Sequence, residues 1–76
     1  MPRRIPPAER RLRQKLASNV RRLRKDRGLT IQDASDRVGL HWRTWQKIEA
    51  GEANATLQTL VRFAEALAVA AHVLIE

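Results

Sequence analysis

The sequence contains no cysteine, only two histidines and no long apolar run. The absence of cysteine excludes disulfides, thiolate metal sites and cysteine nucleophiles, and it fits a reducing, intracellular compartment. His41 and His72 are too few and too far apart to make a zinc site on their own. No segment approaches the roughly 20 apolar residues of a membrane span, and no signal-peptide pattern opens the chain. We therefore expect a cytoplasmic protein with no metal, no cofactor and no membrane contact.

The groups that an enzyme needs are also missing. The sequence has no paired acid and base, no phosphate-binding loop and no nucleophile with a partner, so we expect no catalytic activity. Its 76 residues allow one domain at most. A domain of this size buries only about 60% of its unfolded surface, so good helix packing or dimerisation must stabilise it.

Positive charge is what the sequence has in excess. It carries 15 lysines and arginines against 8 acidic residues, a net charge of +7 and a pI near 11.5. Residues 1–27 hold eleven of these cations and two of the acids. This segment is either a solvated basic face, or an arm and helix that follow a nucleic-acid backbone, and spacing alone does not decide between them. A basic binding module is the class that the composition favours.

Apolar periodicity and glycine positions predict a series of helices. Residues 1–7 are expected to form a flexible basic arm, followed by an amphipathic helix over residues 8–27 and shorter helices over 31–38 and 41–50. A fourth helix follows Thr56. The apolar stripe of the first helix comprises Leu12, Leu16, Val20 and Leu23. The stripe of the fourth comprises Leu57, Leu60, Val61, Ala64 and Leu67, with Phe63 beside it.

The C-terminal segment allows two structures. It could be a short fifth helix, or a strand, because its β-branched residues lie on one face at strand period. A lone strand would leave unpaired edges, so pairing with a symmetry mate would be its natural use. We therefore predict that residues 70–76 form a dimerisation segment, as a two-stranded sheet or a helical seam. Its dimerisation residues would be Val69, Ala71, Val73 and Ile75.

Two short helices joined by a tight glycine-containing turn form a helix-turn-helix. The run from Gly28 to Leu67 resembles the Cro and phage-repressor family, also called the xenobiotic-response-element type. The matching residues are Val20-Arg21-Arg22-Leu23-Arg24, Gly28-Leu29-Thr30, Gly39-Leu40, Thr44, Ile48-Glu49, Gly51, Thr56-Leu57-Gln58-Thr59-Leu60 and Ala64-Glu65-Ala66-Leu67. The resemblance covers about residues 16–69. It implies an all-α, compact bundle of four to five helices, with residues 8–69 as the DNA-binding domain and the third helix in the major groove.

The resemblance also implies which residues contact DNA. The base-reading positions correspond to His41, Trp42, Arg43, Gln46 and Lys47. Periodicity independently places Arg43, Gln46 and Lys47 on one face, opposite Trp45 and Ile48. Arg43 and Lys47 could donate to guanine, and Gln46 could pair with adenine or a phosphate. Further DNA contacts are expected from Arg3, Arg4, Thr30, Gln32 and Asn54, and Arg24 and Glu49 match an internal ion pair of the family.

Several residues depart from the family pattern. Ile31 stands where a phosphate-binding glutamine is usual, and Ala55 replaces a proline. Ala34 is smaller than the residue usual at its position in the family, and Trp45 is larger than the residue usual at its own. The two changes offset each other, which keeps the core volume near its packed value. Trp42 could pack on a thymine methyl or a sugar, or could cover Trp45 or a partner protein.

The N-cap of the third helix is a further departure. His41 stands where serine or threonine is common, and histidine is a poor cap. It could contact a phosphate or a base, or its ring could be partly packed.

Together these patterns predict a bacterial or phage transcriptional regulator. It would bind double-stranded DNA as a homodimeric repressor on a palindromic operator, and be either antitoxin-like or controller-like. The alternative is a protein-interaction module that neutralises a toxin or recruits another factor, with DNA binding secondary. A basic amphipathic helix lying on a membrane is a third possibility, but the first helix carries core-type apolar residues and a complete bundle follows it.

Overall fold

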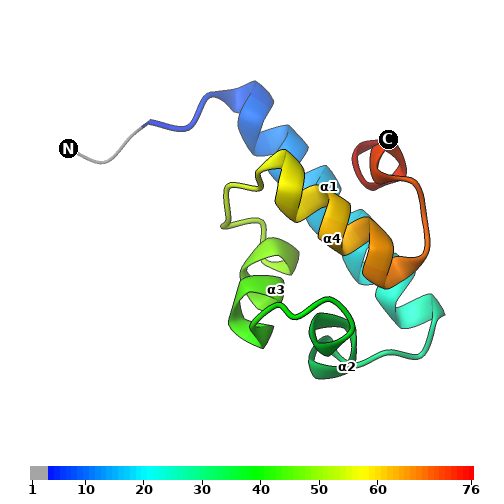
Figure 1. Ribbon diagram of the computed structural model, residues 1–76. Helices are drawn as coiled ribbons and strands as arrows, with labels where there is room; N and C mark the ends of the chain where they lie inside the picture. The colour runs from blue at the N-terminus through cyan, green and yellow to red at the C-terminus, as the bar shows by residue number, and fades with distance from the viewer. Residues whose placement is uncertain (1–3) are drawn as a thin grey trace.

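The structure is a computed structural model that describes residues 4–76, and in that part of the chain every regular element is helical (Figure 1). The α-helices are α1 (Pro7–Asp26), α2 (Ile31–Asp36), α3 (Trp42–Glu49) and α4 (Leu57–Leu67), and a 3-10 helix, η1 (Ala71–Ile75), follows them. The predicted all-α class and the order of the helices are confirmed. Each predicted helix boundary lies within two residues of the observed one.

The core lies where α1, α2, α3, α4 and η1 meet. Trp45 of α3 is fully buried, and its ring lies 4.2 Å from that of Phe63 on α4, centroid to centroid. Ala34 is also fully buried in this cluster, as the exchange of a large for a small residue predicted. α3 is therefore fixed to the rest of the domain by its largest side chain.

The predicted apolar stripes are partly wrong. Leu57 and Val61 of α4 are 81% and 47% exposed, whereas Phe63 and Ala66 are buried. The buried face of α4 is therefore rotated toward Phe63. On α1, Leu12 is 52% exposed, although the next three residues of its stripe are buried.

The strand predicted as one option for the C-terminal segment does not form. Ala68 ends α4 in the left-handed region, with φ of +56°, and the chain turns back toward α1. There η1 buries Leu74 completely, and the Asn19 side chain donates to the Leu74 carbonyl at 2.9 Å. The alternation of Val69, Ala71, Val73 and Ile75 is lost because η1 has a three-residue period.

Candidate nucleic-acid interface

The outward face of α3 carries the polar residues that the sequence assigned to base reading. Trp42, Arg43, Gln46 and Lys47 are all exposed, while Trp45 is buried on the opposite side. No carboxylate within residues 4–76 forms an ion pair with Arg43 or Lys47. This face therefore offers two uncompensated cations and an amide on a rigid helix, the groups that read guanine and adenine edges in a major groove.

The first turn of α3 is organised by a stack of three side chains. The Arg43 guanidinium lies 5.3 Å from the centre of the Trp42 ring, and the His41 ring stacks on the same Trp42 ring, with 5.7 Å between the centroids. Such a cation–π contact contributes about 0.5–1 kcal/mol at an exposed site. Within the described residues, the ring contact of Trp45 is with Phe63, and those of Trp42 are with its two chain neighbours. Trp42 lies against His41 and Arg43, so it restricts the orientations open to the Arg43 side chain.

His41 is a better cap than the sequence suggested. Its Nδ1 atom accepts a hydrogen bond from the backbone N–H of Arg43 at 3.1 Å, which satisfies one of the free donors at the start of α3. When Nδ1 accepts this bond, a donor on the ring can only be Nε2–H. The Nε2–H remains at the surface, where it can donate to a phosphate.

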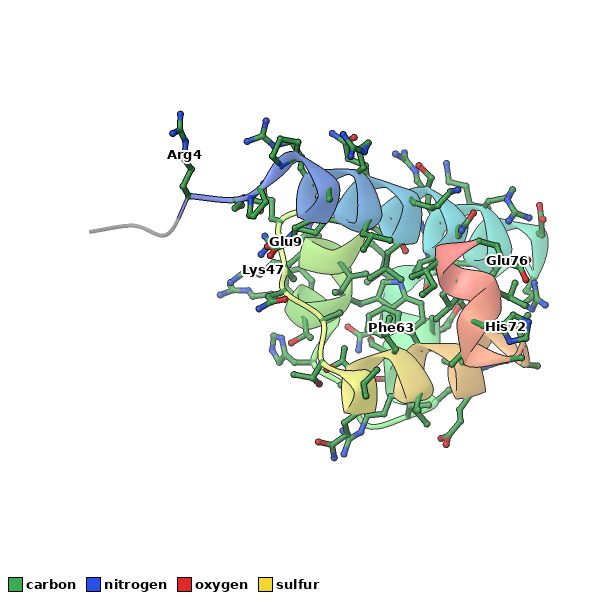
Figure 2. The ribbon with its side chains drawn as sticks, turned by 90° about the horizontal axis from the view of Figure 1, so that it is seen from above. Arg4, Glu9, Lys47, Phe63, His72 and Glu76 are labelled. Atoms are coloured by element: carbon green, nitrogen blue, oxygen red, sulfur yellow. The ribbon has the colours of Figure 1, made fainter. Side chains whose placement is uncertain are left out.

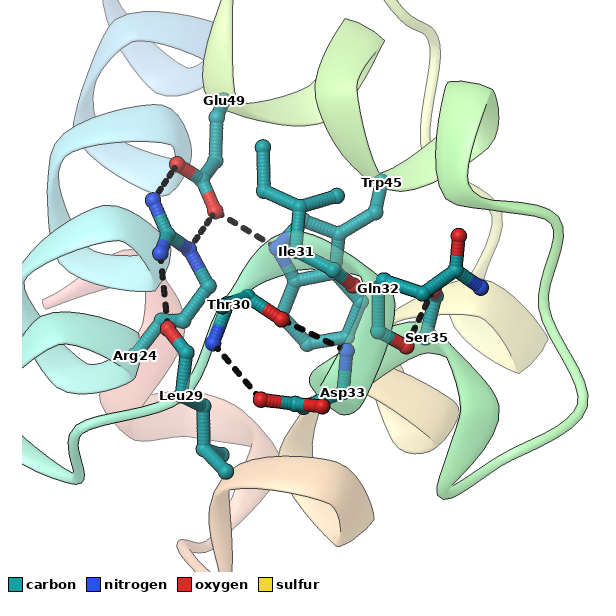
Figure 3. A network of polar contacts seen from close by, with 9 residues as sticks. All are labelled: Arg24, Leu29, Thr30, Ile31, Gln32, Asp33, Ser35, Trp45 and Glu49. Carbon is teal, nitrogen blue, oxygen red and sulfur yellow. Dashed lines mark hydrogen bonds and ion pairs between the residues drawn. The ribbon is translucent and has the colours of Figure 1, made fainter.

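A partly buried polar network holds the other end of α3 (Figure 3). Glu49 accepts from Arg24 Nε at 2.6 Å and from Arg24 Nη2 at 2.9 Å, so the expected ion pair is present and bidentate. Glu49 also accepts from the Trp45 indole N–H at 2.5 Å, and Arg24 Nη1 donates to the Leu29 carbonyl at 2.8 Å. The hydrogen bond to Glu49 raises the pKa of Arg24. This network joins α1, α3 and the segment before α2, and it fixes the direction of α3.

The start of α2 is capped by its own residues. The Thr30 hydroxyl accepts from the Asp33 N–H at 3.0 Å, and Asp33 accepts from the Thr30 N–H at 3.2 Å. Thr30 and Gln32 are exposed, but one Gln32 amide donor is directed to Asp36 at 2.8 Å. Gln32 must release this bond, or use its second N–H, before it can reach a phosphate.

The remaining predicted contacts lie farther from α3. Arg4 is exposed and projects beyond the start of α1 (Figure 2), and Arg3 lies outside the described residues. Asn54 is exposed in the loop between α3 and α4, where it lines a groove with Leu12 and Ile75. The structure thus brings His41, Trp42, Arg43, Gln46 and Lys47 together on one helix. Arg4, Thr30, Gln32 and Asn54 belong to other segments.

Two supporting residues were missed by the sequence analysis. Arg13 pairs with Glu9 at 2.7 Å and donates to the Glu52 carbonyl at 3.2 Å, which ties α1 to the loop after α3. The four-residue spacing of Glu9 and Arg13 was the available signal. Asn19, which holds η1, gives no signal in the sequence, because its partner is a backbone carbonyl 55 residues away.

The described residues contain no cluster of three or more side chains suited to a metal ion. None of the described helices combines the length and the apolar character that crossing a bilayer requires.

Comparison with known proteins agrees with this geometry. The helix-turn-helix domain family matches residues 15–75 of the chain. An uncharacterised HTH-type transcriptional regulator from Sinorhizobium fredii is 36% identical over 58 residues, which cover 76% of this chain and 75% of the relative.

Solved structures show the same arrangement of helices. A hypothetical transcription factor from Neisseria superposes with a TM-score of 0.84 and 30% identity, over 100% of this chain and 86% of the other. The restriction-modification controller protein C.AhdI from Aeromonas hydrophila superposes with a TM-score of 0.78 and 26% identity, over 82% of this chain and 94% of the other. The family match, the sequence relative and the fold agree with the resemblance noted in the sequence. The chain belongs to the helix-turn-helix family of DNA-binding transcriptional regulators.

Proposed function

We propose that the protein is a sequence-specific repressor that binds a palindromic operator as a homodimer, with α3 in the major groove. The observation that carries this proposal is the exposed face of α3, where Arg43, Gln46 and Lys47 lie on a helix held by the Arg24–Glu49 network. A recognition helix must be rigid to distinguish base pairs, because misplacement weakens bidentate contacts. His41, Trp42, Thr30, Gln32, Asn54, Arg3 and Arg4 would add phosphate or sugar contacts around this centre.

The regulatory setting that we favour is a small controller acting in the cytoplasm on DNA, with residues 1–7 as a basic arm and residues 70–76 at the dimer contact. The fold similarity to a restriction-modification controller supports this choice. Its chemistry would be binding alone, without a cofactor. A toxin partner stays a second candidate function, since Trp42 is 38% exposed and exposed aromatic side chains often mark protein interfaces.

The test is selection of bound sites from a pool of random duplexes, followed by variants measured on the selected site. Arg43→Ala should weaken that site by about 1–3 kcal/mol and relax the preference at one base pair, because the bidentate contact to a guanine is lost. The matched control is Arg4→Ala, which should weaken all duplexes alike and reduce the salt dependence by about one phosphate contact.

Failure of the selection to enrich any sequence would overturn the proposal. An Arg43→Ala variant that keeps the full base preference would remove Arg43 from the reading face. Binding of a purified toxin that is abolished by Trp42→Ala, without an effect on the selected site, would favour the second candidate function.

A further inference from the structure

A four-residue sequence occurs twice in α1. Arg10-Arg11-Leu12-Arg13 recurs eleven residues later as Arg21-Arg22-Leu23-Arg24. Eleven residues make about three helical turns, so equivalent positions of the two copies lie on the same side of α1. The repeat therefore produces two similar groups of arginines, one near each end of the same helix face.

The last arginine of each copy turns inward and is used in the fold. Arg13 binds Glu9 and the Glu52 carbonyl, and Arg24 binds Glu49 and the Leu29 carbonyl. The first two arginines of each copy are exposed and have no such use. With two nearby lysines they form a basic surface on α1, which we call the outer strip. It comprises Arg10, Arg11, Lys15, Arg21, Arg22 and Lys25.

The charges of the outer strip are not compensated within the described residues. No carboxylate of residues 4–76 forms an ion pair with any of its six cations, and Arg22 donates only to the Asn19 amide oxygen, at 3.3 Å. Arg11 and Lys15, like Arg21 and Lys25, are four residues apart, and like charges at that spacing destabilise a helix. Repulsion between the cations of the strip therefore destabilises α1. An external polyanion would relieve this repulsion.

The outer strip lies on the side of α1 that is turned away from α3. The opposite side of α1 buries Leu16, Val20 and Leu23 in the core, against α3, α4 and η1. Figure 2 shows nitrogen-tipped side chains along the outer edge of α1, on the far side of that helix from Phe63, while Lys47 projects from another side of the molecule. A duplex held by α3 therefore leaves the strip open.

We propose that the outer strip binds the phosphate backbone of a second DNA duplex, so that one protein assembly bridges two DNA segments. The bridging rests on the proposed binding of an operator by α3, but the contact of the outer strip with DNA does not require the reading face of α3. The two groups of cations are centred eleven residues apart, about 16 Å along the helix. A major groove is about 12 Å wide, so α1 laid across it would place one group near each phosphate ridge.

The composition of the strip favours nucleic acid over an anionic membrane. Four of its six cations are arginine, which binds phosphate bidentately. A helix that lies in a membrane interface inserts a row of large apolar side chains, whereas Leu12 is the large exposed apolar side chain that α1 places beside these cations, in a hollow with Arg11 and Lys15. Leu12 lies at the edge of the strip, where it also lines a second groove with Ile75 and Asn54, and one such side chain does not make a membrane-inserting row.

The test is capture of a labelled duplex of random sequence by protein bound to an immobilised operator. The variant replaces four arginines by glutamine together: Arg10→Gln, Arg11→Gln, Arg21→Gln and Arg22→Gln. We expect the wild-type protein to capture the second duplex with a steep salt dependence. We expect the variant to retain the operator preference, because α3 is unchanged. Its capture of the second duplex should fall at least tenfold. The salt dependence of capture should also become weaker, since each of the four lost phosphate contacts contributes about 0.9 to the salt slope.

The matched control removes cations from α3 instead, as Arg43→Ala with Lys47→Ala. This control should lose sequence preference but still bind random duplex through the outer strip, even if no operator exists, so the two proposals fail separately. Thermal melting should show the four-glutamine variant folded and no less stable than the wild type. Undiminished capture by that variant, or binding of phosphatidylglycerol vesicles in place of the second duplex, would overturn the inference.

Discussion

Two tryptophans three residues apart on α3 have opposite environments. Trp45 is fully buried against Phe63 and donates its indole N–H to Glu49, whereas Trp42 is 38% exposed under the Arg43 guanidinium. Trp45→Ala should lower the free energy of unfolding by about 3–5 kcal/mol, because it leaves a cavity and removes one of the two hydrogen bonds to Glu49 Oε2. Trp42→Ala should cost only about 0.5–1 kcal/mol and weaken operator binding. Urea unfolding followed by circular dichroism measures both, and equal losses would contradict this division of roles.

The pKa of Asp33 leads to a prediction of how the free energy of unfolding changes in acid. The backbone N–H of Thr30, followed by its hydroxyl, lowers the pKa of the Asp33 carboxyl. The unfolded pKa of an aspartate is about 3.9. A carboxyl with a lower pKa in the folded state stabilises the fold at pH values above this unfolded pKa. This contribution is lost as the pH falls through the folded pKa. Asp33→Asn keeps an oxygen acceptor without the charge.

The comparison is between the unfolding free energies of the wild type and Asp33→Asn, from urea titrations between neutral pH and pH 3. The variant should be less stable near neutral pH, and the difference should shrink below about pH 4 as Asp33 takes up its proton. A difference that stays constant into acid would show that the charge of Asp33 does not stabilise the cap.

At the scale of the elements, η1 belongs to the core of its own chain. Leu74 is fully buried, and Asn19 holds the carbonyl of the same residue at 2.9 Å. Leu74→Ala should therefore lower the unfolding free energy by about 2–5 kcal/mol. Leu57→Ala makes the same chemical change on α4 at a side chain that is 81% exposed, and it should change stability by no more than about 0.5 kcal/mol. Thermal melting distinguishes them, and a mild Leu74→Ala effect would mean that η1 is detached in solution.

At the scale of the whole molecule, the proposed dimer must use side chains that the monomer leaves exposed. Ile75 is 42% exposed beside Leu12, whereas Val69, Ala71 and Val73 pack partly against the core of the same chain. If η1 forms the dimer contact, Ile75→Asp should yield a folded monomer, because a carboxylate cannot be buried unpaired at the twofold axis. Such a monomer should bind a full palindrome far more weakly, since two recognition helices must be held roughly 34 Å apart.

Sedimentation and operator binding measure this effect, and Leu57→Asp provides the matched control on α4. A dimer that survives Ile75→Asp but dissociates with Leu57→Asp would place the interface on α4, around Leu57 and Val61. Deletion of residues 70–76 is not an informative test, because it also removes the buried Leu74 side chain.

The sequence by itself determined the helices, their order and the two faces of α3. These features depend on interactions between residues close in the chain. Glycines at positive φ follow α1, α2 and α3, as Gly39 does after α2, and the 3.6-residue period separates Trp45 from Arg43 and Lys47. The resemblance to repressors added the Arg24–Glu49 pair, which the structure contains.

Only the tertiary structure decided which side chains of each apolar stripe are buried. It also decided which secondary structure the C-terminal residues form. Leu57 and Phe63 are both apolar, and the distant Trp45 ring determines which of them enters the core. The segment ending at Ile75 has β-branched residues typical of a strand, yet it forms a 3-10 helix because burial of Leu74 and the Asn19 hydrogen bond outweigh local propensity. Local preferences differ by about 1 kcal/mol or less, whereas full burial of a leucine contributes about 1.5–3 kcal/mol, so contacts between distant segments prevail.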